Sequence, residues 1–132
     1  MDELIARVAQ AAGIDPEVAR KAIGEILAFL QKEGPQAEVA QLLEKLPGGV
    51  DMAAAAASTE STGGGGLMGG LMGMMGGGGG LMGLAGKLTG LGLGMGEMQA
   101  VGKELFAAGR EQAGEDVVGQ IAGAIPGLGQ FI

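Results

Sequence analysis

Residues 15–34 read DPEVARKAIGEILAFLQKEG, and this stretch decides the fold class. Asp15 followed by Pro16 is a helix start signal, because Asp favours the N-cap position and Pro the first helical position. The apolar residues that follow recur at helical period, and Gly34-Pro35 ends the pattern. They are Val18, Ala22, Ile23, Ile26, Leu27 and Leu30. The sequence therefore predicts a long amphipathic helix.

Shorter helical patterns flank this stretch on both sides. Upstream, an apolar stripe at helical period precedes Gly13, which is a helix stop; it consists of Leu4, Ile5, Val8, Ala9 and Ala12. Downstream, a second stripe precedes Pro47-Gly48-Gly49; it consists of Val39, Leu42, Leu43 and Leu46. No segment alternates at period two with β-branched residues, so no sheet is expected. The predicted fold class is all-α.

The same order of features returns in the C-terminal part of the chain. Matched positions are separated by 80, then 78, then 79 residues, and both series end on an aliphatic residue followed by Pro-Gly, at Leu46-Pro47-Gly48 and Ile125-Pro126-Gly127. The last helical stripe of the second series is Val117, Val118, Ile121, Ala122 and Ile125. This pattern indicates a duplication. It predicts tandem three-helix units at 1–48 and 81–132, joined by a segment at 49–80.

The joining segment changes composition along its length. Asp51 precedes the alanine run 53–57 and predicts a short helix there. From Ser61 to Gly86 there is no charged residue, and 14 of the 24 residues from 63 to 86 are glycine. Glycine costs about 1 kcal/mol per helical residue relative to alanine, so this stretch opposes helix formation in water by about 14 kcal/mol. Isolated in water, it should not be helical.

The residues between these glycines are leucine and methionine, whereas flexible linkers usually carry Ser, Thr or charge. Their spacing continues through Leu91, Met95 and Met98 as one helical face would, and glycines four apart permit close helix approach. Three interpretations of this segment stay open: a disordered linker, a packed or self-associating helix, and insertion into a membrane. On the association hypothesis, buried contacts come from Leu67, Met68, Leu71, Met72, Met74, Met75, Leu81, Met82, Leu84 and Leu88, and close approach from Gly69, Gly73, Gly77, Gly86, Gly90 and Gly94.

Composition narrows the function classes. The chain of 132 residues has no Cys and no His, which removes thiolate and imidazole chemistry and the commonest zinc ligands. A formal charge of −7 disfavours nucleic-acid binding. The acidic start Met1-Asp2-Glu3 lacks the basic region of a secretory signal, so cytoplasmic residence is expected, with the inner-membrane surface as an alternative.

Sequence motifs of catalysis or cofactor binding do not meet their structural requirements. Glycines 64, 66 and 69 fit the dinucleotide pattern, but no buried strand precedes them. Met68, Met72, Met74 and Met75 are soft donors suited to Cu(I), but packing is the more frequent use of such a cluster. We therefore expect no catalytic residues, no cofactor and no metal.

Two family resemblances are present. Residues 3–26, with Glu3-Leu4-Ile5, Val8-Ala9 and Ala12-Gly13-Ile14, resemble the opening helical hairpin of HU-type DNA-bending proteins, whose β-arms and basic residues are absent here. The apolar pattern of both repeats is similar to small bacterial all-helical families known only as domains of unknown function. It is carried by Ala22-Ile23, Leu27, Leu30, Val39-Ala40, Leu42-Leu43 and Leu46-Pro47-Gly48. This resemblance implies a bacterial, non-enzymatic helical domain.

The expected function is association. The chain should self-associate, or dock on a larger complex or membrane surface, through its central Gly/Met/Leu-rich segment, since burying several Leu and Met side chains could offset the glycine penalty. One alternative is a soluble adaptor in which this segment is a flexible tether. Another is a carrier of an apolar ligand such as a lipid or quinone.

Overall fold

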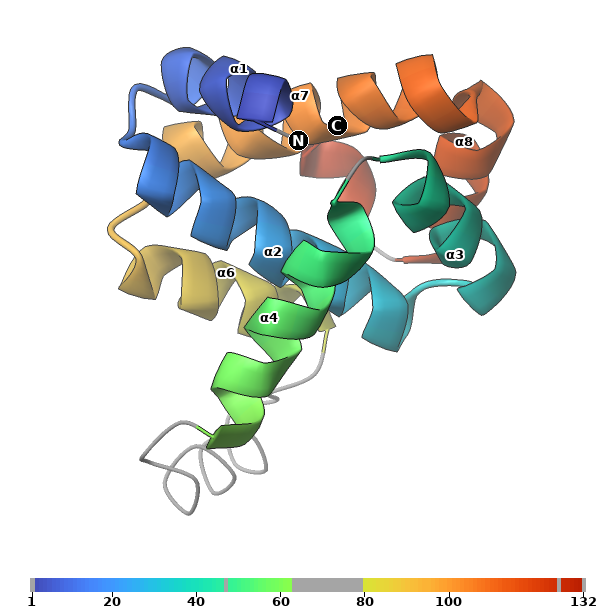
Figure 1. The fold of residues 1–132 in the computed structure, drawn as a ribbon, viewed down its shortest axis with the longest axis horizontal. Coiled ribbons are helices and arrows are strands. Elements are labelled where there is room, and N and C mark those ends of the chain that lie inside the picture. Colours follow the sequence, from blue (N-terminus) through green and yellow to red (C-terminus); the bar gives the residue numbers. More distant parts are fainter. Residues whose placement is uncertain (1, 47, 63–79, 126, 132) are drawn as a thin grey trace.

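The computed structural model describes residues 2–46, 48–62, 80–125 and 127–131, which form helices and short connections (Figure 1). The α-helices are α1 (Asp2–Ala12), α2 (Pro16–Glu33), α3 (Gln36–Lys45), α4 (Gly49–Thr62), α6 (Gly80–Gly90), α7 (Met95–Ala113) and α8 (Glu115–Ala124), followed by the 3-10 helix η1 (Leu128–Phe131). Within these ranges there is no strand. The all-α prediction is confirmed.

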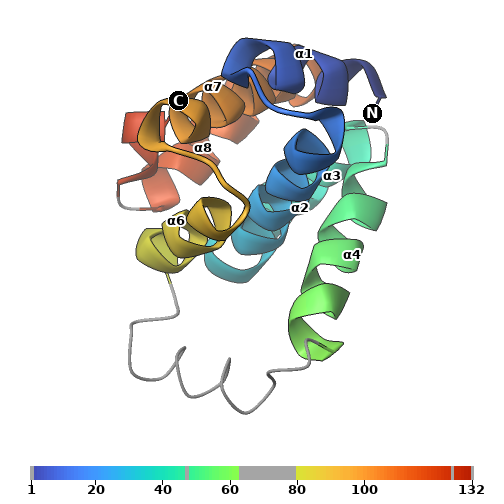
Figure 2. The ribbon, with the colours of Figure 1, turned by 90° about the vertical axis from the view of Figure 1, so that its left-hand side faces the viewer.

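Helix α2 occupies the centre of the molecule, and α4 and α6 pack against it from opposite sides (Figure 2). Helix α7 runs across one face of this layer and is covered by α1 (Figure 1). Helices α3 and α8 pack together at one end. The central position of α2 explains why its sequence is apolar over most of its circumference, with nine buried residues.

The two halves of the chain share one core. Helix α1 of the first half packs on α7 of the second, and α6 of the second half packs on α2 of the first. Further contacts between the halves join α2 with α7, and α3 with both α7 and α8. Every described helix of the first series therefore contacts the second, so the two helical series interlock and do not form separate bundles.

Backbone conformation repeats between the halves at one fixed offset. Gly13 and Gly92 follow α1 and α6 with φ of 68° and 93°, and Gly48 and Gly127 follow α3 and α8 with φ of 78° and 85°. These left-handed conformations disfavour residues with a Cβ. Each pair is separated by 79 positions.

Helix-terminal hydrogen bonds repeat at the same offset. The Ile14 N–H donates to the Ala9 carbonyl at 3.0 Å, and the Leu93 N–H donates to the Leu88 carbonyl at 3.2 Å. Likewise, Val39 donates to Pro35 at 2.9 Å and Val118 donates to Gly114 at 3.3 Å. These bonds share the offset of 79, whereas the bonds that close the two long helices, from the Gly34 N–H to the Leu30 carbonyl and from the Gly114 N–H to the Arg110 carbonyl, are 80 apart.

Three local expectations need correction. Asp15 occupies the N-cap position of α2, but its side chain makes no capping hydrogen bond. Helix α4 extends well beyond the predicted 53–57, from Gly49 to Thr62. The expectation that Leu91, Met95 and Met98 continue the face of α6 is wrong, because α6 ends at Gly90 and α7 begins only at Met95. The left-handed Gly92 between them reverses the chain.

The core of the described residues is entirely apolar, with no buried polar or charged side chain. The predicted stripes of α2 and α3 supply much of it. The largest side chains with almost no exposed surface are Phe106, Ile23, Leu27, Leu30, Leu42, Leu105, Ile121 and Leu128. Because dispersion and the hydrophobic effect are weakly directional, shape must fix how these helices pack.

One such shape constraint lies between α2 and α4. A Cβ added at Gly24 would be 3.0 Å from the carbonyl oxygen of Met52 and 3.5 Å from the Cβ of Ala56. Glycine at this position therefore lets the two helix backbones approach closely. In α7 the position 79 residues later is Lys103, which is exposed. The two long helices thus differ at the site where α2 receives α4.

Candidate association site

Only part of the predicted association set falls among the described residues. Outside them lie Leu67, Met68, Gly69, Leu71, Met72, Gly73, Met74, Met75 and Gly77. Leu81 and Met82 belong to the first turn of α6. Leu84, Gly86, Leu88, Gly90 and Gly94 can be placed in full. Helix α6 is therefore the described portion of the candidate association site.

Leu84 and Leu88 face the chain's own interior. They are 6% and 3% exposed and belong to the common core. The sequence-based expectation assigned them to contacts with another molecule. In this structure they are covered by the same chain, so they are not accessible to a partner while α6 is docked.

The three placed glycines differ in their surroundings. Gly86 and Gly90 lie in exposed positions of α6, and a Cβ at either would meet no atom within 4 Å. They give α6 an outer strip without side chains, which another helix could approach closely. Gly94 lies beyond the end of α6, at the N-cap of α7, where its N–H donates to the Glu97 carboxylate at 3.1 Å. It is therefore not part of the same helical face.

Helix α6 shows how a glycine-rich sequence becomes ordered. It reads GLMGLAGKLTG, with glycine at four of its 11 positions. These glycines cost about 4 kcal/mol in helix propensity relative to alanine. Full burial of two leucine side chains contributes about 1.5–3 kcal/mol each, which is of the same size. Helix formation at α6 therefore depends on its leucines being covered.

A charged pair also holds α6 against α2. The Lys87 ammonium lies 3.7 Å from the Glu25 carboxylate oxygen Oε2. That oxygen is buried and has no hydrogen-bond partner within the described structure. Lys87 also lies in the last turn of α6, where a cation complements the helix dipole. The pair therefore lies at the contact of α6 with α2, beside the buried face that Leu84 and Leu88 supply.

An apolar cavity lies where α6 meets the core. The cavity has a volume of about 20 Å³. The lining residues come from four helices and are Ile26, Leu84, Ala85, Leu88, Met98, Gly102, Phe106 and Leu128. A cavity of about 10–15 Å³ is large enough for one water molecule, but the apolar lining offers a water no hydrogen-bond partner. The small residues at this contact leave α6 imperfectly packed.

Sequence reasoning missed the opposing wall of this contact. Gly102 and Phe106 of α7 and Leu128 of η1 were not assigned to the site. The available signal was the duplication, because 79 positions before Gly102 and Phe106 lie Ile23 and Leu27, both core residues. Because Gly102 stands where the matched core position holds Ile23, the second half has less side-chain volume at this point, which indicates a packing gap.

Other surface features complete the description. Val50 in α4 and Met95 in α7 are large apolar residues with exposures of 50% and 66%. No group of three or more carboxylates that could bind a metal ion occurs in the described ranges. None of the described helices combines the length and hydropathy needed to cross a membrane. The methionines considered for Cu(I) lie outside the described residues.

No family model, no curated protein and no solved structure matches the chain. The resemblances to HU-type hairpins and to bacterial helical families therefore stay expectations from the sequence.

Proposed function

We propose that this chain is a non-enzymatic association protein that self-associates, or docks on a larger complex, through residues 63–79. This segment has the Leu/Met/Gly composition of α6 and directly precedes it. Helix α6 carries the proposal, because it shows that such a sequence is helical when its leucines are covered. By the same physics, residues 63–79 would order on binding a surface that covers their leucines and methionines.

The attachment of this segment supports the proposal. Helix α4 ends at Thr62 and α6 begins at Gly80, both on the side of the molecule away from α1 (Figure 2). The core of the described residues already buries its large apolar side chains. The segment is therefore joined to one side of a closed core, where a partner could reach it without opening that core.

The decisive experiment replaces residues 63–79 with a Gly/Ser sequence of equal length, which retains the connection between α4 and α6. Static light scattering with and without detergent measures the assembly, and far-UV circular dichroism checks the fold. We expect the native chain to be oligomeric and the replaced chain to be monomeric. An assembly that survives the replacement would show instead that the segment is a tether, as in the adaptor alternative.

A second experiment tests the glycine face. Gly73→Leu and Gly90→Leu should each weaken assembly, because a large side chain would prevent close approach. Gly90 has open space around its Cβ position, so leucine there does not disturb the core. Gly119→Leu in α8 is the matched control, since that position is equally open. Equal effects at positions 90 and 119 would argue against a specific glycine face.

The carrier alternative gains little support. The cavity beneath α6 is far smaller than the 300–1,000 Å³ typical of small-molecule pockets. Mass spectrometry of protein purified without detergent would show a copurified lipid or quinone if the alternative were correct.

A further inference from the structure

Helices α1 and α6 are equivalent in the repeat but differ in composition and burial. Helix α1 contains no glycine, and its four buried residues are Leu4, Ile5, Val8 and Ala9. Helix α6 has four glycines among 11 residues, and only Leu84 and Leu88 are buried among its described side chains. Glycine is the poorest helix former apart from proline. The chain therefore contains a strongly held and a weakly held version of one docking helix.

The contact beneath α6 is also less complete than the contact beneath α1. The cavity of about 20 Å³ lies under α6, and the side chains that line a void lose dispersion contacts on that side. The Lys87 ammonium and the Glu25 carboxylate oxygen are 3.7 Å apart, which exceeds hydrogen-bond distance. By contrast, Arg7 of α1 makes two hydrogen bonds to α7, at 3.1 and 3.2 Å. Both apolar and polar contacts thus hold α6 less firmly than α1.

The other described helices pack on one another without α6, which lies on the outside of α2 (Figure 2). Helix α1 packs on α2 and α7, α3 packs on α7 and α8, and α4 packs on α2. The two long helices α2 and α7 also contact each other directly. Removal of α6 would therefore leave a connected helical core in place.

We propose that α6 undocks and unfolds as a unit while the other described helices stay packed. Weakly packed segments commonly open below the free energy of global unfolding. Leu84 and Leu88 are covered in the docked structure and become accessible in the open state. This inference goes beyond the proposed function, because it concerns described residues alone and holds even if residues 63–79 are only a tether.

Amide hydrogen exchange of the native chain, followed by NMR at increasing urea concentrations, tests the proposal. The repeat supplies a matched pair of probes. The Leu93 N–H donates to the Leu88 carbonyl at the end of α6, and 79 positions earlier the Ile14 N–H donates to the Ala9 carbonyl at the end of α1. Leu93 is buried and Ile14 is partly exposed, so burial alone predicts stronger protection at Leu93.

Separate opening of α6 predicts the reverse order. We expect the protection factor of Leu93 to be at least about tenfold below that of Ile14. Exchange at Leu93 should also depend only weakly on urea, because undocking one short helix exposes little surface. Protection at Leu93 that equals or exceeds that at Ile14, or a urea dependence as steep as that of the α2 amides, would overturn the proposal.

A pair of glycine variants locates the opening unit. Gly86 in α6 and Gly119 in α8 are both exposed, and an added Cβ at either meets no atom within 4 Å. Alanine at either position should slow exchange through global unfolding by about two- to fivefold. Only Gly86→Ala should slow exchange at Leu93, because Gly119 stays helical when α6 alone opens. Slower exchange at Leu93 in Gly119→Ala, or unchanged exchange there in Gly86→Ala, would overturn the proposal.

Discussion

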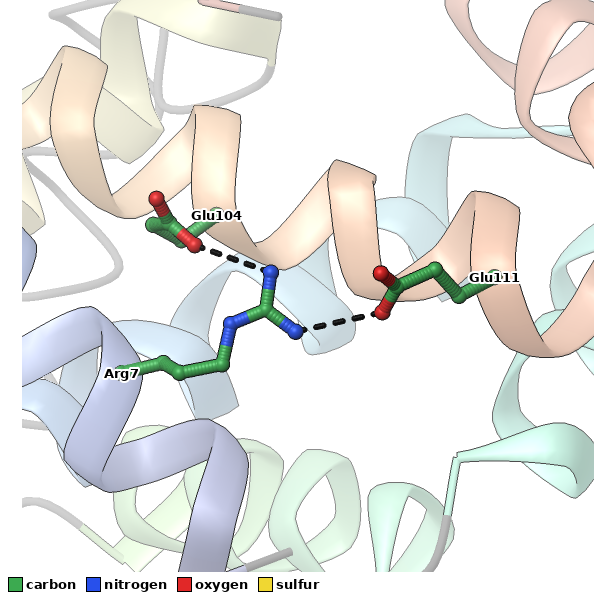
Figure 3. Close-up of polar contacts among 3 residues, drawn as sticks. All are labelled: Arg7, Glu104 and Glu111. Atoms are coloured by element: carbon green, nitrogen blue, oxygen red, sulfur yellow. Dashed lines mark hydrogen bonds and ion pairs between the residues drawn. The ribbon is translucent and has the colours of Figure 1, made fainter.

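Arg7 of α1 donates a hydrogen bond to Glu104 of α7 at 3.2 Å, which joins the first helix of one half to the second helix of the other (Figure 3). Arg7 also donates to Glu111 at 3.1 Å. The reciprocal contact of α6 with α2 has the pair Lys87 and Glu25. Glu25 and Glu104 are 79 positions apart and Arg7 and Lys87 are 80 apart, so the ionic contacts follow the repeat to within one position. They mark equivalent helix crossings in an apolar core.

The Arg7 cluster should make a small, salt-sensitive contribution to stability. All three side chains are partly exposed, so screening weakens their attraction. We expect Arg7→Gln to lower the urea midpoint slightly in low salt and to have no effect in 1 M NaCl. An effect that persists at high salt would mean that Arg7 stabilises mainly through packing of its alkyl chain.

The pH dependence of this cluster follows from the direction of the pKa shift. The hydrogen bond and charge of Glu111, and secondarily those of Glu104, raise the pKa of Arg7. Its stabilising effect is thus complete below the unfolded-state pKa and is lost only as pH rises through the higher folded-state pKa. Titration of Arg7 should therefore cause no change across neutral pH in the difference in unfolding free energy between Arg7→Gln and the native chain. A decline between neutral and mildly alkaline pH would contradict the assignment.

The equivalent pair at α6 can be tested by a charge-removal cycle. Lys87→Met should destabilise the fold by roughly 0.5–1 kcal/mol, because Glu25 is left without its ion-pair partner. The double change Glu25→Gln/Lys87→Met should recover part of this loss, since no unpaired charge remains. Urea unfolding followed by circular dichroism measures both. A double variant that loses the sum of the single effects would show that the pair is not coupled.

Alanine substitution at two helical glycines should change the free energy of unfolding in opposite directions. At Gly24, the new Cβ would lie 3.0 Å from the Met52 carbonyl oxygen, so α4 must shift at a cost of about 1–3 kcal/mol, partly offset by higher helix propensity. At Gly86 the space is open, so alanine should stabilise the fold by about 0.4–1 kcal/mol. Chemical denaturation distinguishes the two. Stabilisation at both positions would show that α4 yields easily.

Phe106 should be among the most sensitive core positions. It is 1% exposed and lines the cavity beneath α6, so Phe106→Ala would enlarge an existing void and cost about 3–5 kcal/mol. Met95→Ala is the control, because Met95 is 66% exposed and its truncation should change stability by less than about 0.5 kcal/mol. Thermal and urea unfolding give the comparison. Similar losses for both would contradict the assigned burial.

The sequence predicted the helices better than their arrangement. Period and stop signals identified α2 and α3 together with their buried residues, because local spacing determines which side of a helix is apolar. The crossing of α1 onto α7 and of α6 onto α2 could not be read in this way, since both contacts join residues far apart in the chain. The glycine break expected at Gly94 and Gly96 begins earlier, at Gly92, because the leucines on either side of Gly92 hid where α6 ends. The outward Gly86 and inward Leu84 could be assigned to opposite faces, but not to a particular neighbour.

The hydrocarbon interior has a consequence for how this chain reaches its native state. Two similar amphipathic helices, α1 and α6, must each dock on the correct long helix. Apart from the Glu25 oxygen that faces Lys87, the described core offers no buried polar group to distinguish the two docking sites. Discrimination must then come largely from shape, such as Gly102 at the α6 contact, whose matched position in the first half is Ile23. Folding intermediates in which α1 and α6 have exchanged sites would bury similar apolar surface but pack less well. Their main energetic cost would therefore be poor packing.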